Sequence, residues 1–165
     1  MPWLSPAEEA AFTAIFRARW VSLVAFLIKA GGSRQDAEDA AQAACVALAK
    51  TWRRVDHPEA WLRTTAFRMW LKSLYRIRPD ELTDQLPERL AGDHSDDVAE
   101  KIAMVQLVRR LPLLQRTVMA FEIDGCRPSE TAEALGIPAV NVRQNLRRAR
   151  ANLKRWLSED GGGAE

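Results

Sequence analysis

Basic side chains recur along the last apolar-periodic segment of the chain, from about Ala139 to Trp156. They follow three- and four-residue steps, so they share one side of a helix: Arg143, Arg147, Arg150 and Lys154, joined by Arg148 and Arg155. No acidic residue occurs between Ala139 and Ser158, so these cations repel one another unless they meet anions such as phosphates. The pattern indicates contact with a nucleic acid backbone, and a merely solvated basic helix is the plainer alternative.

A short expected helix, Ser129–Leu135, and a glycine turn, Gly136–Pro138, come directly before this segment. That order is typical of a helix-turn-helix, whose second helix lies in the major groove of DNA. Asn141, Gln144 and Asn145 stand in the first turns of the last helix, where side-chain amides can read base edges. An apolar stripe at helical spacing is expected to face the core: Val142, Leu146, Ala149, Leu153 and Trp156.

The helix expected from about Glu59 to Arg76 is a second candidate for nucleic acid binding. It interleaves Trp61 and Trp70 with Arg63 and Arg68. Aromatic rings beside cations are typical of surfaces on which unstacked bases lie along a phosphate track. The alternative is that both tryptophans are core residues, and the rings need not all share one role.

A third candidate is the acidic and polar face of the helix opened by Ser33, formed by Glu38, Asp39 and Gln42. It is a plausible protein-docking surface. The alternative is a solvated helix start, where carboxylates are favoured by the helix dipole.

The chain shows no pattern that we interpret as an enzyme or a metal site. His57 and His94 are isolated, and no phosphate-binding glycine loop or nucleophile–base set is visible. Cys45 and Cys126 are far apart without a nearby histidine, so neither a zinc site nor a disulfide is expected. We predict no metal, no cofactor and no catalysis, and place Cys45 in the core.

Helical periodicity and helix start signals run through the whole chain, which predicts an all-α protein. The formal net charge of +2 hides two basic blocks around an acidic stretch. We therefore predict two small helical domains, 1–76 and 98–165, joined by a flexible acidic linker, 77–97. No secretory signal and no apolar run of spanning length is expected, which places the chain in the cytoplasm.

Taken in order, three segments resemble a bacterial RNA polymerase sigma factor of the extracytoplasmic-function class. Asp36–Gln42 is similar to its polymerase-docking segment, and Pro58–Leu62 to the start of its promoter-melting helix. The C-terminal part resembles its DNA-binding domain through Leu111, Pro112, Arg116, Glu130, Ala132, Leu135–Ile137, Val142 and Leu146–Arg150.

The resemblance implies a sigma factor that binds core RNA polymerase, directs promoter-specific initiation and has an anti-sigma protein as a partner. Polymerase docking would fall to Glu38, Asp39 and Gln42. The single-stranded −10 element, with a flipped base near the loop 54–57, would be held by Arg54, Asp56, His57, Trp61, Arg63, Arg68 and Trp70. The duplex −35 element would be read by Asn141, Arg143, Gln144, Asn145, Arg147, Arg148 and Arg150.

The chain departs from the family pattern at several of these positions, which predicts a divergent member. Ala43–Cys45 replace an acid, a hydroxyl and an aromatic residue, and Arg68 and Lys72 replace Asn and Asp. Two other functions remain open at this point. One is a helix-turn-helix regulator that does not form a holoenzyme, and the other is an adaptor that has lost DNA binding.

Overall fold

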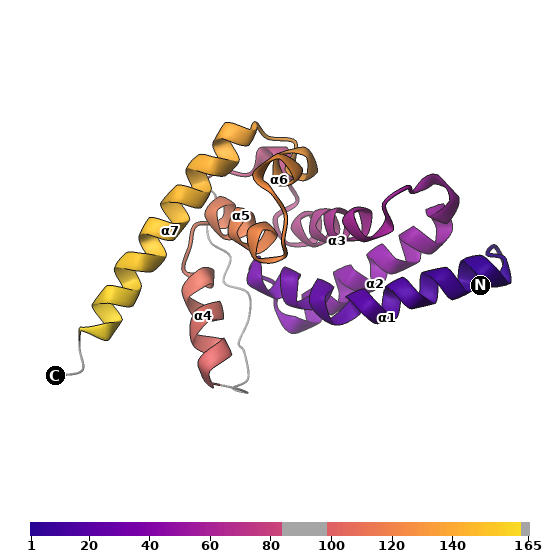
Figure 1. Ribbon diagram of the computed structural model, residues 1–165, viewed down its shortest axis with the longest axis horizontal. Coiled ribbons are helices and arrows are strands. Elements are labelled where there is room, and N and C mark those ends of the chain that lie inside the picture. The colour runs from indigo at the N-terminus through magenta and orange to yellow at the C-terminus, as the bar shows by residue number, and fades with distance from the viewer. Residues whose placement is uncertain (84–98, 163–165) are drawn as a thin grey trace. The chain divides into compact units, whose positions relative to one another are not determined.

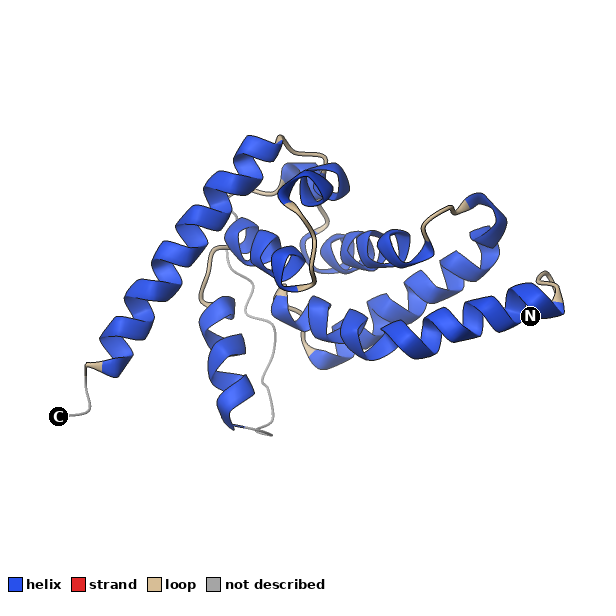
Figure 2. Ribbon diagram, in the orientation of Figure 1, coloured by secondary structure: helices blue, strands red, loops and turns tan. Residues whose placement is uncertain are grey.

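The computed structural model describes residues 1–83 and 99–162. Every regular element in these two ranges is a helix (Figure 2), which confirms the all-α prediction. Most of the expected linker, residues 84–97, and His94 lie outside the described residues. The start of the linker is described and contains the short 3-10 helix η2, Pro79–Glu81.

The chain divides into two compact units. The first comprises Met1–Ile28 and Gly32–Arg78, and the second comprises Lys29–Gly31 and Pro79–Glu165. The functional roles expected for the two parts remain predictions.

The first unit holds α1 (Pro6–Lys29), α2 (Arg34–Thr51), the 3-10 helix η1 (Trp52–Arg54) and α3 (Pro58–Tyr75). The start signals read from the sequence act as expected. Ser5 Oγ accepts a hydrogen bond from the Glu8 backbone N–H at 3.3 Å, and Ser33 Oγ accepts one from Asp36 N–H at 3.1 Å. These caps satisfy backbone donors that have no partner inside the helix.

The core of the first unit lies where α2 meets α3, two helices that run side by side (Figure 1). α2 contributes small side chains, and Ala37, Ala41 and Ala44 are fully buried. Because alanine has little bulk, the large rings of α3 pack close to the α2 backbone, and Phe67 and Trp70 are fully buried as well.

The second unit is built around α5 (Leu113–Ile123), with α4 (Ala99–Arg109), α6 (Pro128–Leu135) and α7 (Ala139–Gly161). Nearly all of α5 is buried, and its Val118 and Phe121 join Leu111, Leu135 and Val142 in the core. α7 continues beyond the expected end at Trp156, to Gly161, because no proline or glycine occurs in 157–160.

The expectation that no segment is long and apolar enough to span a membrane is wrong for α1. This helix has 24 residues and contains an 18-residue window of mean hydropathy 1.6, of which 22% is buried. The test is weak support for a span, because helices that contribute to a folded core pass it too. α1 does contribute to one, since Leu23, Val24, Phe26 and Leu27 are buried.

Candidate nucleic-acid interface and docking surface

α7 has the two faces that the sequence predicted. Val142 and Ala149 are fully buried and Leu146 is 3% exposed, so this stripe faces the core of the second unit. The stripe weakens towards the C-terminus, where Leu153 and Trp156 are half-buried. The arginines of the first four turns are exposed: Arg143, Arg147, Arg148 and Arg150.

α6, the turn and α7 form a helix-turn-helix. Gly136 adopts the left-handed conformation with φ 69°, and its N–H and that of Ile137 donate to Ala132 O at 2.9 and 3.2 Å. These bonds end α6, and Pro138 occupies the N-cap position of α7 without a side-chain capping bond. α7 packs on both α5 and α6. These contacts fix its orientation, so its exposed side has a defined direction within the second unit.

The first residue before α6 is Arg127, where a helix usually has a side-chain oxygen to cap its N–H groups. Glu130 compensates from inside the helix. Its carboxylate accepts the Arg127 backbone N–H at 2.7 Å and the Arg127 guanidinium at 3.3 Å. Glu130 therefore fixes the start of α6 although Arg127 offers no side-chain oxygen there.

Asn145, one of the residues expected to read bases, points into the second unit and not into solvent. Asn145 is 5% exposed, and its amide donates to Asn141 O at 2.8 Å, one turn back along α7. Its Oδ1 atom is buried with no hydrogen-bond partner in the described part of the chain. In this conformation Asn145 does not reach a base edge, whereas Asn141 and Gln144 are exposed.

The basic stripe is not uniformly available. Arg150 pairs with Glu122 of α5, so this cation is shared with a carboxylate of its own unit. Arg110 lies 4.4 Å from the ring centroid of Trp156, a cation–π contact that covers part of the indole. Arg143, Arg147 and Arg148 are exposed cations in the first turns of α7.

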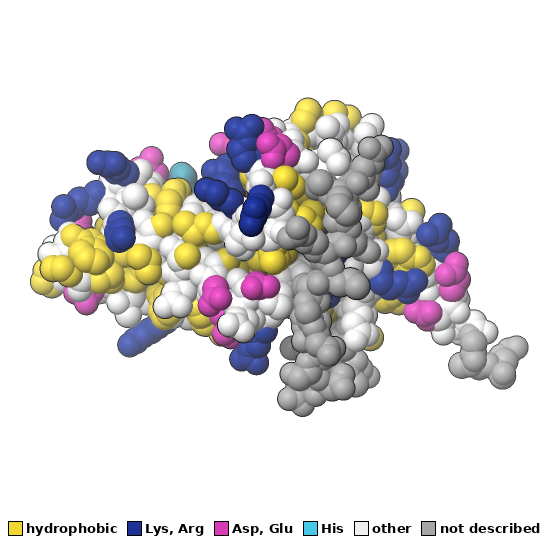
Figure 3. Space-filling view, turned by 180° about the vertical axis from the view of Figure 1, so that it is seen from behind, with side chains coloured by type: hydrophobic (Ala, Val, Ile, Leu, Met, Phe, Trp, Pro, Cys, Tyr) yellow, Lys and Arg dark blue, Asp and Glu magenta, His cyan; other side chains and the backbone are white. Residues whose placement is uncertain are grey.

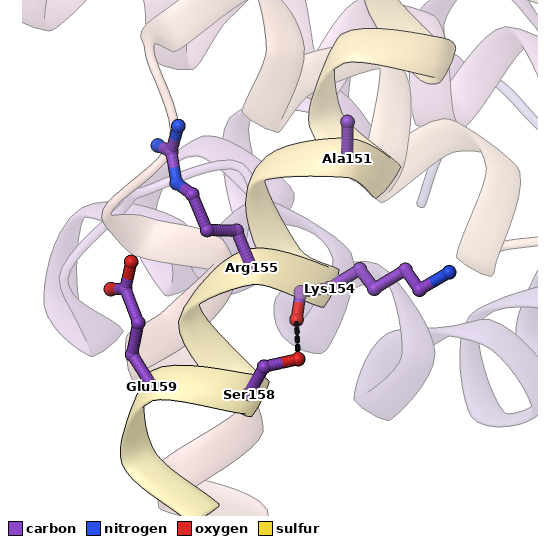
Figure 4. A pocket seen from close by; sticks show the side chains of 5 residues that line it. All are labelled: Ala151, Lys154, Arg155, Ser158 and Glu159. Atoms are coloured by element: carbon purple, nitrogen blue, oxygen red, sulfur yellow. Dashed lines mark hydrogen bonds between the residues drawn. The ribbon is translucent and has the colours of Figure 1, made fainter. Parts of the chain in front are cut away.

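The C-terminal part of α7 carries a recess lined by Ala151, Lys154, Arg155, Ser158 and Glu159 (Figure 4). Ser158 Oγ donates back to Lys154 O at 2.9 Å, so the hydroxyl is used within the helix. Glu159 and Asp160 bring acidic charge to this end. The recess therefore marks where the basic part of α7 stops.

In the first unit the structure separates the two tryptophans of α3. Trp70 is fully buried against Phe67, with ring centroids 5.7 Å apart, and it does not lie on a surface that DNA can reach. The expectation that Trp70 contacts the −10 strand is therefore wrong. It is a core residue whose ring packs between Phe67 and Tyr75 of its own helix and next to Gly32, just before α2. Trp61 is half-buried, so part of it remains accessible.

The other residues expected at the −10 strand are accessible. Arg54 at the end of η1 is exposed, and so are Asp56 and His57 in the loop that leads to α3. Arg68 is exposed on α3, and Arg63 is half-buried. Glu59 at the start of α3 pairs with Arg19 of α1, and the hydrogen bond from this guanidinium holds the pKa of Glu59 below its ordinary value.

The acidic face of α2 is accessible but partly neutralised. Asp39 and Gln42 are exposed, whereas Glu38 is half-buried and accepts a hydrogen bond from Arg34 Nε at 3.1 Å. This is a same-helix pair four residues apart, which stabilises the start of α2. Asp39 and Gln42 are therefore the more accessible residues of this face.

Cys45 lies in the core of the first unit, as predicted, and burial raises the pKa of its thiol to about 11. Cys126 is also a buried free thiol. No group of three or more potential metal ligands occurs among the described residues.

Sequence reasoning missed the residues that hold η1. Arg53 is bound by Glu8, and Trp52 is contacted by Phe12. These partners lie more than 35 residues apart in the chain, and no local pattern joins them. The only local indication of this pairing is Arg53 itself, a charged residue directly before the exposed loop.

Comparison with known proteins agrees with this geometry. Residues 101–153 match the family model described as "Sigma-70, region 4", a range that covers most of α4, α5 and α6 and part of α7. The chain is 29% identical over 157 residues to an ECF RNA polymerase sigma factor, SigM, of Mycobacterium tuberculosis, covering 91% of this chain and 79% of that one. It is 28% identical over 127 residues to the RNA polymerase sigma-E factor of Streptomyces coelicolor, covering 74% and 72%.

Two solved structures share the fold. CnrH, solved in complex with the cytosolic domain of CnrY, superposes with a TM-score of 0.66 at 24% identity over 92% of this chain and 90% of that one. The sigma factor RpoE of Bartonella quintana, in complex with the anti-sigma factor NepR, gives 0.71 at 18% identity over 90% and 97%. At this identity the likeness concerns the fold alone.

Two helical units, the second with an exposed basic helix in a helix-turn-helix, define a DNA-binding transcription protein. Together with the region 4 match and the two relatives, they make the chain similar to sigma factors of the extracytoplasmic-function class.

Proposed function

We propose that this chain binds core RNA polymerase and directs initiation at promoters that its two units recognise separately. The observation that carries the proposal is the coincidence of the region 4 match with the helix-turn-helix. The matched range 101–153 contains four exposed arginines of α7: Arg143, Arg147, Arg148 and Arg150. Polymerase performs the chemistry of transcription, and we assign no catalytic step to this chain.

In this proposal α7 enters the major groove of the −35 element. Asn141 and Gln144 read base edges, since both are exposed in its first turns. Arg143, Arg147, Arg148 and Arg150 contact phosphates, with Arg150 exchanging Glu122 for DNA. Asn145 is left out of the base-reading group because its amide is used inside the helix.

The first unit opens the −10 element and docks on polymerase. The accessible residues of the loop and of α3 hold the single strand: Arg54, Asp56, His57, Trp61, Arg63 and Arg68. Asp39 and Gln42, with Glu38, form the docking surface for polymerase. The domain roles thus follow the units, with residues 1–76 for docking and melting and 98–165 for the −35 element.

We further propose that an anti-sigma protein regulates this chain in the cytoplasm. The support is indirect: RpoE, which shares the fold, was solved with an anti-sigma factor. No residue of this chain is assigned to that contact.

Run-off transcription with purified core polymerase on genomic fragments tests the proposal. A sigma factor forms a stable holoenzyme and yields discrete transcripts that core polymerase alone does not make. A protein that binds DNA but yields neither result is a regulator, and one with no salt-dependent DNA affinity is an adaptor. Either outcome would overturn the assignment.

A further inference from the structure

Three contacts join the first residues of the chain to η1 and to the end of α2. The Glu8 carboxylate accepts two hydrogen bonds from Arg53, from Nε at 2.7 Å and from Nη2 at 2.9 Å. Trp3 Nε1–H donates to Ala49 O at 3.2 Å. The Phe12 and Trp52 rings meet edge to face, with centroids 6.0 Å apart.

Glu8 is a fixed anchor, because it also belongs to the start of α1. Its carboxylate accepts the Ser5 backbone N–H at 2.7 Å, and its own N–H donates to Ser5 Oγ at 3.3 Å. The hydrogen bond from Arg53 is the largest of the effects that hold the pKa of Glu8 at about 2, so the carboxylate is charged at neutral pH. A bidentate pair of this kind fixes orientation as well as distance.

The segment that these contacts hold leads directly into the loop assigned to the flipped −10 base. Trp52–Arg54 form η1, and Val55 N–H closes the turn on Trp52 O at 3.3 Å. Arg54, the last residue of η1, is exposed, and the exposed residues Asp56 and His57 follow directly. Hydrophobic side chains, with basic ones near them, gather at the end of the unit that carries the N-terminus (Figure 3).

We propose that Glu8, Trp3 and Phe12 are positioning residues that set the conformation of the loop from Trp52 to His57 and thereby its choice of −10 base. The Arg53 side chain points towards the Glu8 carboxylate, and this ion pair connects the loop to α1. The inference rests on the proposed function, because it takes the loop as the −10 contact.

The first test needs no polymerase. Amide hydrogen exchange is measured by mass spectrometry on the full chain and on three variants, Glu8→Gln, Glu9→Gln and Ser5→Ala. Glu9 is the matched control, since it is the next residue and pairs with the N-terminal amine at 3.8 Å. Ser5→Ala weakens the start of α1 but keeps the carboxylate on Arg53.

We expect Glu8→Gln to raise exchange of peptides covering residues 49–57 by roughly tenfold. The two control variants should match the parent chain there. Equal exchange in Glu8→Gln and in the parent chain would overturn the positioning role.

The second test measures promoter choice in transcription with core polymerase and a template library randomised across the −10 element. Glu8→Gln should flatten the base preference and lower productive initiation several-fold, with holoenzyme affinity equal to that of the parent chain. The exchanged pair Glu8→Arg with Arg53→Glu should restore both. Impaired single variants without rescue would mean that Arg53 acts on DNA itself, which contradicts the proposal.

The two failures are distinguishable. A parent chain that forms no holoenzyme overturns the proposed function, and with it the promoter part of this inference. Normal transcription with an unchanged −10 preference in Glu8→Gln overturns the positioning role alone.

Discussion

The indole nitrogen of Trp70 lies 2.9 Å from the point that a Cβ atom on Gly32 would occupy. Leu27 O lies 3.1 Å from the same point, so the backbone confines it from another side. Trp70 is fully buried and cannot swing away into solvent. The absence of a side chain at Gly32 therefore lets the chain pass over the core tryptophan at the start of α2.

Gly32→Ala should destabilise the protein, because the added methyl group forces the Trp70 ring or the backbone to shift. Overpacking of this kind typically costs about 1–3 kcal/mol. Urea unfolding followed by tryptophan fluorescence measures the loss. Gly161→Ala is the matched control, since nothing lies within 4 Å of its Cβ position at the end of α7. Equal stability of the Gly32→Ala variant and the parent chain would contradict the packing argument.

Asn145→Ala should leave the −35 base preference unchanged, because the Asn145 amide donates within α7. Gln144→Ala, one residue away and exposed, should lose discrimination at a single base pair by about 1–3 kcal/mol. Holoenzyme binding to a series of single-base −35 variants measures both. A change of base preference in Asn145→Ala would mean that the amide turns outwards on DNA.

Arg147→Ala together with Arg148→Ala should weaken promoter binding without unfolding the protein. If both cations contact phosphates, the slope of log affinity against log salt should fall by about 1.8. Lys154→Ala with Arg155→Ala removes the same charge near the acidic end of α7 and should change the slope less. Unchanged affinity at fixed salt in the first pair would contradict the assignment.

Asp39→Ala together with Gln42→Ala should weaken holoenzyme formation by about tenfold or more, about 1.4 kcal/mol, since both side chains are exposed on α2. Lys50→Ala, an exposed change on the same helix, is the control. Fluorescence anisotropy of the labelled chain with core polymerase gives the affinities. If the pair binds as tightly as the control, the docking surface lies elsewhere.

The contribution of the Glu8–Arg53 pair should depend on pH with a defined sign. The pKa of Glu8 is lowered from 4.5 to about 2 in the folded chain, so the stabilisation is complete above about pH 5. It is lost as the pH falls from about 4.5 towards 2, where the folded state also takes up the proton. The difference in unfolding free energy between the parent chain and Glu8→Gln should shrink over that range. A difference that does not vary with pH would contradict this.

Local patterns predicted most of the fold. The cap at Ser33, the glycine that ends α6 and the apolar stripe of α7 depend on neighbours within a few residues, and all appear as expected. A nucleic-acid interface on the last helix could also be predicted, because its stripe of cations without acidic residues lies within one helix.

Rotamers and long-range pairs could not be predicted in this way. Nothing in the spacing distinguishes an outward Asn145 from one that bonds the backbone a turn back. Trp70 reads as a stacking ring or as core equally well until α2 is placed against it. The Arg53–Glu8 pair joins residues 45 positions apart, a distance at which sequence periodicity carries no information.

In the proposed function, α7 extracts little sequence information from a promoter, and the inward turn of Asn145 removes one of its candidate base-reading residues. From Asn141 to Arg148 a helix advances about 10 Å, and base pairs stack about every 3.4 Å, so its first turns span about three base pairs. Three positions distinguish at most roughly 64 sequences, whereas a genome offers about a million or more competing sites. Promoter selectivity must then come from recognition of two short elements, −35 and −10, at a fixed distance from each other. The spacer between the −35 and −10 elements thus becomes a third recognised feature that neither unit touches as sequence.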